Sequence, residues 1–245
     1  MNAAFLTFTC ARDAALVPLW AQAVRRLCPS APLIAAVDRA DECMPLPRKV
    51  TRFVTDFDRQ GNLNGLAAIA GILGTIAAVG QGTGLPVVKI DTDTVLAGCN
   101  WLAELGALDY IGFEGGHPLT ATGICYGMTA AGAQKIISSC SPWPWQSSGK
   151  LPEDQTICSL ALLHSRARLH PWAGGRHVLA FMPGHFGRPE VLRKAAVAIH
   201  CGQASGLAKY GPAVNRTHLV SRMMRTTLRC LSGRQRRFPA PQPAP

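Results

Sequence analysis

Two carboxylates, Asp91 and Asp93, lie one residue apart directly after the apolar run Val87–Ile90. This run predicts a buried strand, so both carboxylates emerge at its C-terminal end. Ligands of open α/β sheets bind at that edge. Two carboxylates at positions i and i+2 can jointly hold a divalent cation, and hard oxygen ligands suit Mg²⁺ or Mn²⁺. The pattern predicts a metal site for a phosphate-bearing ligand, although two aspartates are also typical of a solvated turn.

The elements that must position these carboxylates follow an alternating α/β pattern. Ala4–Thr9 and residues 33–37 predict strands, and the apolar spacing over residues 14–27 predicts a helix between them. Since proline is tolerated only in the first turn, Pro18 predicts that this helix begins around Val17. The β-α-β opening implies a parallel pair of strands with a right-handed crossover.

The alternation continues to about residue 200. A helix is expected over residues 66–79, broken by the glycine-containing segment 80–84, and Thr129 is expected to cap a helix that runs to about Ile137. The remaining pattern predicts strands at 49–54, 109–113, 123–126, 178–181 and 197–200, and helices at 155–163 and 215–232. The expected fold is α/β, with a mixed, mostly parallel sheet flanked by helices.

Four stretches of the chain resemble, in order, the motifs of GT-A-fold glycosyltransferases. VVKIDTDTVL, which contains Asp91 and Asp93, resembles their Asp-x-Asp segment. Residues 123–133 resemble the glycine-containing acceptor-side loop, residues 151–157 the Glu-Asp helix start, and residues 198–202 the late histidine of the metal site. The opening residues 5–37 also resemble the first β-α-β unit of that family, so the resemblance covers about residues 4–202.

The resemblance implies a GT-A-like fold, with a Rossmann-like nucleotide-binding half and an acceptor half. It further implies a hexosyltransferase that moves a sugar from a nucleoside-diphosphate donor, with a UDP-sugar as the expected donor. The acceptor would be a glycan, a lipid-linked molecule or another hydroxyl compound. Both inverting and retaining enzymes use this fold, so the stereochemistry stays open.

The resemblance also assigns roles to individual residues. Asp91 and Asp93 would hold the metal on the diphosphate, with Asp93 the more direct ligand and His200 the third protein ligand. Glu153 or Asp154 would meet the acceptor hydroxyl. Asp154 is the preferred general base of an inverting reaction, because the dipole at a helix N-terminus keeps a carboxylate ionised. The alternatives are an ordinary half-buried histidine and two acidic residues that only cap a helix.

Other polar residues lie where a nucleotide or sugar would be bound. Thr9, Arg12 and Asp38 come at the ends of the first two strands and are candidates for nucleoside contacts. Lys209 either reaches the diphosphate or belongs to a basic surface. The tryptophans of the segment SPWPW, residues 141–145, either stack on a sugar ring or fill an apolar plug.

A phosphatase of the haloacid dehalogenase type is the rival enzyme, since Asp91 could act as its nucleophile and Asp93 as its acid/base. That fold needs a later acidic pair for Mg²⁺, and no later acidic residue has the required sequence context. The Asp-x-Asp motif also opens the phosphatase fold, whereas a β-α-β unit precedes it here. These two departures favour the glycosyltransferase.

The net charge of +11 is concentrated in the last third of the chain. Residues 1–154 hold 11 basic and 13 acidic side chains, whereas residues 155–245 hold 14 basic ones and a single acid, Glu190. The charge therefore says little about the reaction. It bears on what the C-terminal part contacts.

We expect three parts: a GT-A-like domain over residues 1–205, a basic helical extension over 206–237 and a disordered Pro-rich tail over 238–245. Apolar residues within 217–231 can form a stripe beside arginines, as in helices that lie on anionic lipid. Docking on the core is the alternative. Nucleic acid is less favoured, because aromatic residues are nearly absent from this end.

The cysteine content and the N-terminus bear on location. The nine cysteines include no C-x-x-C pair, which favours reduced thiols over a disulfide framework or a zinc site. The first residues lack the basic segment of a secretory signal. We expect a cytoplasmic protein, peripheral on the inner face of the membrane where the basic segment contacts it.

Overall fold

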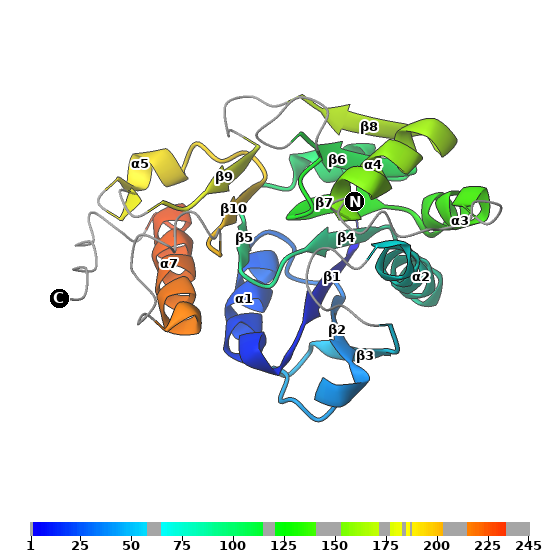
Figure 1. Ribbon diagram of the computed structural model, residues 1–245. Helices are drawn as coiled ribbons and strands as arrows, with labels where there is room; N and C mark the ends of the chain where they lie inside the picture. The colour runs from blue at the N-terminus through cyan, green and yellow to red at the C-terminus, as the bar shows by residue number, and fades with distance from the viewer. Residues whose placement is uncertain are drawn as a thin grey trace.

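The computed structural model describes residues 2–57, 65–114, 121–140, 153–171, 177–182, 185–186, 188–202 and 215–233. These residues form a mixed α/β fold with a seven-stranded sheet of order β3-β2-β1-β4-β7-β6-β8 and a second sheet of order β5-β10-β9 (Figure 1). The expected mixed, mostly parallel sheet flanked by helices is confirmed.

The first half of the large sheet is parallel. Its strands are β1 (Ala4–Thr9), β2 (Leu33–Asp38), β3 (Thr51–Thr55) and β4 (Val87–Ile90). Strand β1 is paired in parallel with β2 on one side and β4 on the other. All residues of β1 and β4 are buried, as expected for parallel strands covered on both faces. Because these strands are parallel, their carboxyl ends meet at one edge.

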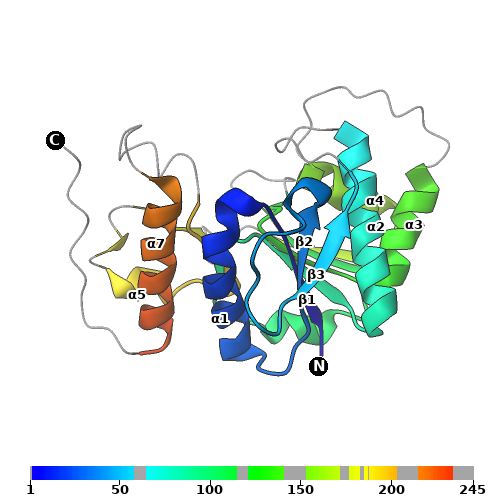
Figure 2. The same ribbon diagram turned by 90° about the horizontal axis from the view of Figure 1, so that it is seen from below.

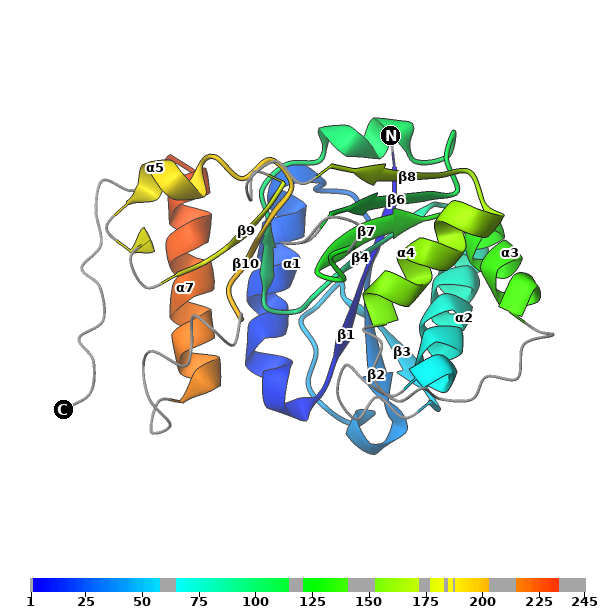
Figure 3. The same cartoon turned by 45° about the horizontal axis from the view of Figure 1, so that its top comes forward.

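An antiparallel strand interrupts the second half of the large sheet. Strand β7 (Cys125–Met128) runs antiparallel to both β4 and β6 (Tyr110–Phe113), and β8 (Ala167–His170) pairs in parallel with β6. The sequence did not predict β8, because its four-residue segment ARLH is too short to give a clear pattern. The small sheet contains β5 (Thr94–Leu96), β9 (Val178–Ala180) and β10 (Ala198–His200). It lies between the large sheet and α5 (Pro189–Leu192) (Figure 3).

The main helices divide between the two faces of the large sheet. Helices α2 (Gly65–Thr83), α3 (Ala130–Cys140) and α4 (Glu153–His164) lie on one face, and α1 (Val17–Leu27) and α7 (Arg216–Leu231) on the other (Figure 2). Two separate apolar cores match this division. Short 3-10 helices complete the fold: η1 (Ala11–Leu16), η2 (Arg39–Asp41) and η3 (Asn100–Glu104). As predicted, α1 begins at Val17 with Pro18 in its first turn.

Helix α2 is longer than the sequence predicts. It continues through Gly80 to Thr83, and the break comes only at Gly84, whose φ of +66° favours glycine. Gly80 serves a packing contact instead. A Cβ there would lie 2.9 Å from the Cβ of Ala130, so the glycine lets α3 approach α2 closely.

Helix α7 is part of the core. Its apolar side chains are buried in the same cluster as those of α1 and β5: Leu219, Val220, Met223, Met224 and Leu228. Asn215 caps the helix, accepting a hydrogen bond from the backbone N–H of His218 at 3.0 Å. The apolar side of this basic segment therefore docks on the protein, and the exposed arginines Arg225 and Arg229 face outward. No helix among the described residues has the length and apolar character needed to cross a membrane.

Asp109 joins three elements at the far side of the large sheet. Its buried carboxylate accepts hydrogen bonds from Lys135 of α3 (2.7 Å) and from the backbone N–H of Arg166 beside β8 (3.2 Å). Thr129 caps α3 as predicted, with its hydroxyl accepting from the N–H of Gly132 at 3.0 Å. Burial alone would raise the pKa of Asp109, but the bonds from Lys135 and Arg166 outweigh it and lower the pKa to about 2.

We expect Asp109→Asn to destabilise the fold by about 2 kcal/mol at neutral pH, since a lowered pKa measures how much the folded state favours the carboxylate. When folding lowers the pKa of a carboxyl group, the ionised group stabilises the folded protein above its unfolded-state pKa. This stabilisation is lost as the pH falls through the folded-state pKa. The difference between wild type and variant should therefore shrink between about pH 4 and pH 2. Urea unfolding across this range measures it.

The exposed ion pair of Asp56 with Arg39 supplies the control. Asp56→Asn removes the same charge from a solvent-screened position and should change the stability little. Equal losses for both variants would contradict the role given to Asp109.

Candidate metal site

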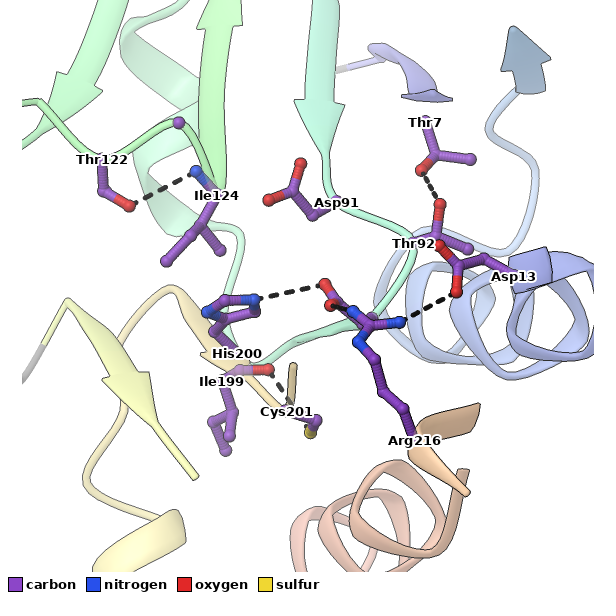
Figure 4. Close-up of polar contacts among 12 residues, drawn as sticks. Thr7, Asp13, Asp91, Thr92, Thr122, Ile124, Ile199, His200, Cys201 and Arg216 are labelled. Carbon is purple, nitrogen blue, oxygen red and sulfur yellow. Dashed lines mark hydrogen bonds and ion pairs between the residues drawn. The ribbon is translucent and has the colours of Figure 1, made fainter. Parts of the chain in front are cut away.

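The two aspartates flank a tight turn anchored to the sheet. The backbone N–H of Thr94 donates to the carbonyl of Asp91 at 3.1 Å, closing the turn at the end of β4. Between them, Thr92 is buried, and its hydroxyl lies 3.0 Å from the carbonyl of Phe8 and 2.9 Å from the hydroxyl of Thr7 (Figure 4). The central threonine fixes the turn against β1, and the carboxylates on either side are presented to the site.

His200 reaches this turn through strand pairing. Strand β10 runs antiparallel to β5, with His200 opposite Thr94, and the N–H of Cys201 donates to the carbonyl of Asp93 at 2.9 Å. The His200 Nε2 lies 3.3 Å from Asp93 Oδ1 (Figure 4). The register of two short strands thus brings together residues far apart in the sequence.

Asp91, Asp93 and His200 form a compact group of candidate ligands. One ligand atom from each can be chosen so that all three lie within 4.8 Å of one another. This is the one such group of histidine, cysteine and acidic side chains among the described residues. Two carboxylates and an imidazole suit Mn²⁺, and the oxygens also suit Mg²⁺, so the residues present fit a divalent cation.

Arg216, the first residue of α7, lies beside this group. Its Nη2 donates to Asp93 Oδ2 at 2.9 Å, and its Nη1 donates to Asp13 Oδ1 at 2.9 Å (Figure 4). Both oxygens of Asp93 therefore have a protein partner, His200 on one side and Arg216 on the other. The fork of the guanidinium ties the turn after β4 to η1 and α7.

Lys89 balances the other aspartate. It precedes Asp91 by two residues on β4, so both side chains project from the same face. Its Nζ lies 2.5 Å from Asp91 Oδ1 and also donates to the carbonyl of Gly123. The lysine side chain is buried, whereas that of Asp91 is about one-third exposed. A buried ammonium is stable there because the carboxylate compensates its lost hydration.

The charges of the site alter two pKa values. Burial alone would raise the pKa of Asp93, but the hydrogen bond from His200 and the positive charges of His200 and Arg216 lower it below its ordinary value. Burial alone would lower the pKa of His200, but Asp93, with a smaller effect from Asp91, raises it. The geometry therefore favours an ionised Asp93 next to a protonated His200.

The candidate nucleoside residues lie at the same edge of the sheet, because Thr9 pairs with Val37, the neighbour of Asp38. Thr9 is buried, and its hydroxyl has no hydrogen-bond partner within the described ranges. Arg12 is 74% exposed. Asp38 accepts a hydrogen bond from the hydroxyl of Thr55 at 3.2 Å.

Only part of the predicted acceptor side lies within the described residues. Helix α4 begins at Glu153, where the sequence predicted a helix start. The side chains of Glu153 and Asp154 lie outside the described part of the chain, as do Lys209 and the tryptophan segment 141–145.

Three residues of the site were not singled out from the sequence: Asp13, Lys89 and Arg216. Lys89 carried a usable signal, since a charged residue inside an apolar strand needs a partner and Asp91 follows at the spacing of one face. Arg216 and Asp13 carried no such signal in the sequence. Their pairing depends on where α7 packs, and the sequence offered Arg216 only as one basic residue among many.

In comparisons with known proteins, no family model matches this chain, and no curated protein matches it.

Gly202 shows how tightly this site is packed. A Cβ at position 202 would lie 1.7 Å from Asp93 Oδ2 and 3.1 Å from Arg216 Nη2. We expect Gly202→Ala to displace the Asp93 carboxylate and to destabilise the protein by about 1–3 kcal/mol, the usual cost of overpacking. Chemical denaturation measures this loss.

Gly74→Ala is the matched control, since a Cβ at this helical position meets no atom within 4 Å. It should leave the stability unchanged or raise it by up to about 1 kcal/mol. A Gly202→Ala protein as stable as the wild type would contradict the packing described for the site.

Proposed function

We propose that this protein is a metal-dependent glycosyltransferase with a GT-A-like fold, which moves a sugar from a nucleoside-diphosphate donor to a hydroxyl acceptor. The observation that carries the proposal is the meeting of Asp91, Asp93 and His200 at the carboxyl edge of the parallel strands. The order of the sequence motifs suggested the same three residues.

The arrangement of the fold supports a nucleotide-binding half. Strands β3, β2, β1 and β4 are parallel, and ligands of such sheets bind outside their carboxyl ends. Thr9, Arg12 and Asp38 lie at this edge and are the proposed nucleoside contacts. The antiparallel strand β7 and helices α3 and α4 make up the proposed acceptor half.

Asp91, Asp93 and His200 would hold Mn²⁺ or Mg²⁺ together with the diphosphate of the donor. The ion, when bound, supplies positive charge that stabilises the departing nucleoside diphosphate. Lys89 orients Asp91 through the contact of 2.5 Å. The hydroxyl of Thr92 fixes the turn, so the two carboxylates keep their positions during the reaction.

On the acceptor side, Asp154 is the proposed general base and Glu153 the alternative. Both residues lie at the beginning of α4, where the helix dipole favours an ionised carboxylate. Lys209 is a further candidate for the diphosphate. The exposed arginines of α7 support a lipid-linked or surface-glycan acceptor, because they would hold the enzyme on an anionic membrane surface.

The phosphatase alternative gains no second acidic pair from the described residues. Asp109 is tied to Lys135 and Arg166, and Glu104 pairs with Arg168. Phosphate release from a generic phosphoester, absent from a glycosyltransferase, would favour the phosphatase.

Metal-dependent turnover of a nucleotide sugar tests the proposal directly. We expect hydrolysis or transfer from a UDP-sugar that requires Mn²⁺ or Mg²⁺, and Asp93→Asn should lower kcat/KM by at least about 100-fold. His200→Ala should weaken Mn²⁺ binding, measured by titration calorimetry. Glu190→Gln removes an exposed negative charge on α5 and should leave both properties unchanged. Metal-independent turnover that survives Asp93→Asn would rule out this mechanism.

A separate experiment addresses the base. We expect Asp154→Asn to lower kcat for transfer by about 100-fold or more while Mn²⁺ binding stays the same, because general-base catalysis acts on the acceptor and not on the metal. Glu153→Gln is the matched variant on the neighbouring residue. A large loss only for Glu153→Gln would move the role to that residue, and two fully active variants would remove the base from α4.

A further inference from the structure

We propose that Arg216 is an internal counter-cation of the metal site, which makes the binding of a divalent cation depend on an anionic diphosphate. This inference rests on the proposed function and adds an order of binding to it. Its residue comes from α7, the helix that the sequence predicted only as a basic extension.

The geometry places Arg216 in competition with a metal ion for Asp93. The guanidinium donates to Asp93 Oδ2 at 2.9 Å, and His200 Nε2 lies 3.3 Å from Asp93 Oδ1. The carboxylate is 13% exposed, so water replaces few of these contacts. A cation that approaches Asp93 therefore competes with positively polarised partners that the protein already supplies.

The charges of the site lead to the same conclusion. Three carboxylates, Asp13, Asp91 and Asp93, are in ion pairs with three basic side chains, Arg12, Lys89 and Arg216. Without His200, the formal charges of these six groups sum to zero. A divalent cation alone thus meets no net negative charge, unlike the typical protein site for such an ion. A nucleoside diphosphate brings the missing negative charge with it.

Arg216 can also form a new ion pair when the diphosphate binds. Its planar fork of donors matches phosphate oxygens, so the guanidinium can exchange Asp93 for the diphosphate without losing its charged partner. Asp13 holds the other arm of the fork at 2.9 Å and keeps the side chain beside the site during the exchange. Mn²⁺ and the diphosphate should therefore strengthen each other's binding.

Titration calorimetry with Mn²⁺ in the absence and presence of saturating uridine 5′-diphosphate measures this coupling. For the wild type we expect the diphosphate to raise the Mn²⁺ affinity by about 10-fold or more after correction for Mn²⁺ binding to free nucleotide. Arg216→Met should raise the affinity for Mn²⁺ alone by about 5-fold or more and reduce the coupling. Arg216→Lys, which keeps the charge but not the fork, should retain the weak binding of Mn²⁺ alone.

Arg225→Met is the matched control, because it removes the same charge from an exposed position of the same helix. It should behave as the wild type in both titrations. A wild type that binds Mn²⁺ equally well with and without the diphosphate would overturn this inference and leave the metal site standing. This comparison uses only the wild-type protein, so its result does not depend on whether a variant folds. Wild-type protein that binds no Mn²⁺ under either condition would overturn the proposed function itself.

Discussion

The Asp93 carboxylate is the point at which distant parts of this fold meet, and its burial sets conditions on everything around it. A buried carboxylate is stable only with charged or hydrogen-bonding partners. His200 from the small sheet and Arg216 from α7 provide them, one on each oxygen. Gly202 leaves the space that this arrangement needs. The small sheet, the C-terminal helix and the turn after β4 therefore depend on one another.

The charged residues of the site are joined by ion pairs. Lys89 offsets Asp91, and Arg216 bridges Asp93 and Asp13, which also lies near Arg12. Such pairing allows several charges to lie close together at the edge of a sheet without unfavourable repulsion. It also means that an incoming cation or anion changes a balance that already exists, which connects the electrostatics of the fold to the proposed chemistry.

Helix α7 serves two purposes at once. Its apolar side completes the core around α1 and β5, while its first residue reaches the candidate metal site. The basic outer side, with Arg225 and Arg229, stays exposed. A segment that could be taken for an appendage is thus integral to the site.

The sequence by itself determined the β-α-β opening, the buried strand before Asp91, the limits of α1 and the capping of α3 by Thr129, because apolar periodicity and capping are local properties. The pairing of Asp91 and Asp93 with His200 came from the resemblance. The antiparallel insertion of β7, the short strands β5 and β8, and the roles of Arg216 and Asp13 were decided only by the tertiary structure. Strand order and the position of α7 depend on contacts between residues far apart in the chain, and no local pattern encodes which distant partner a buried charge will find.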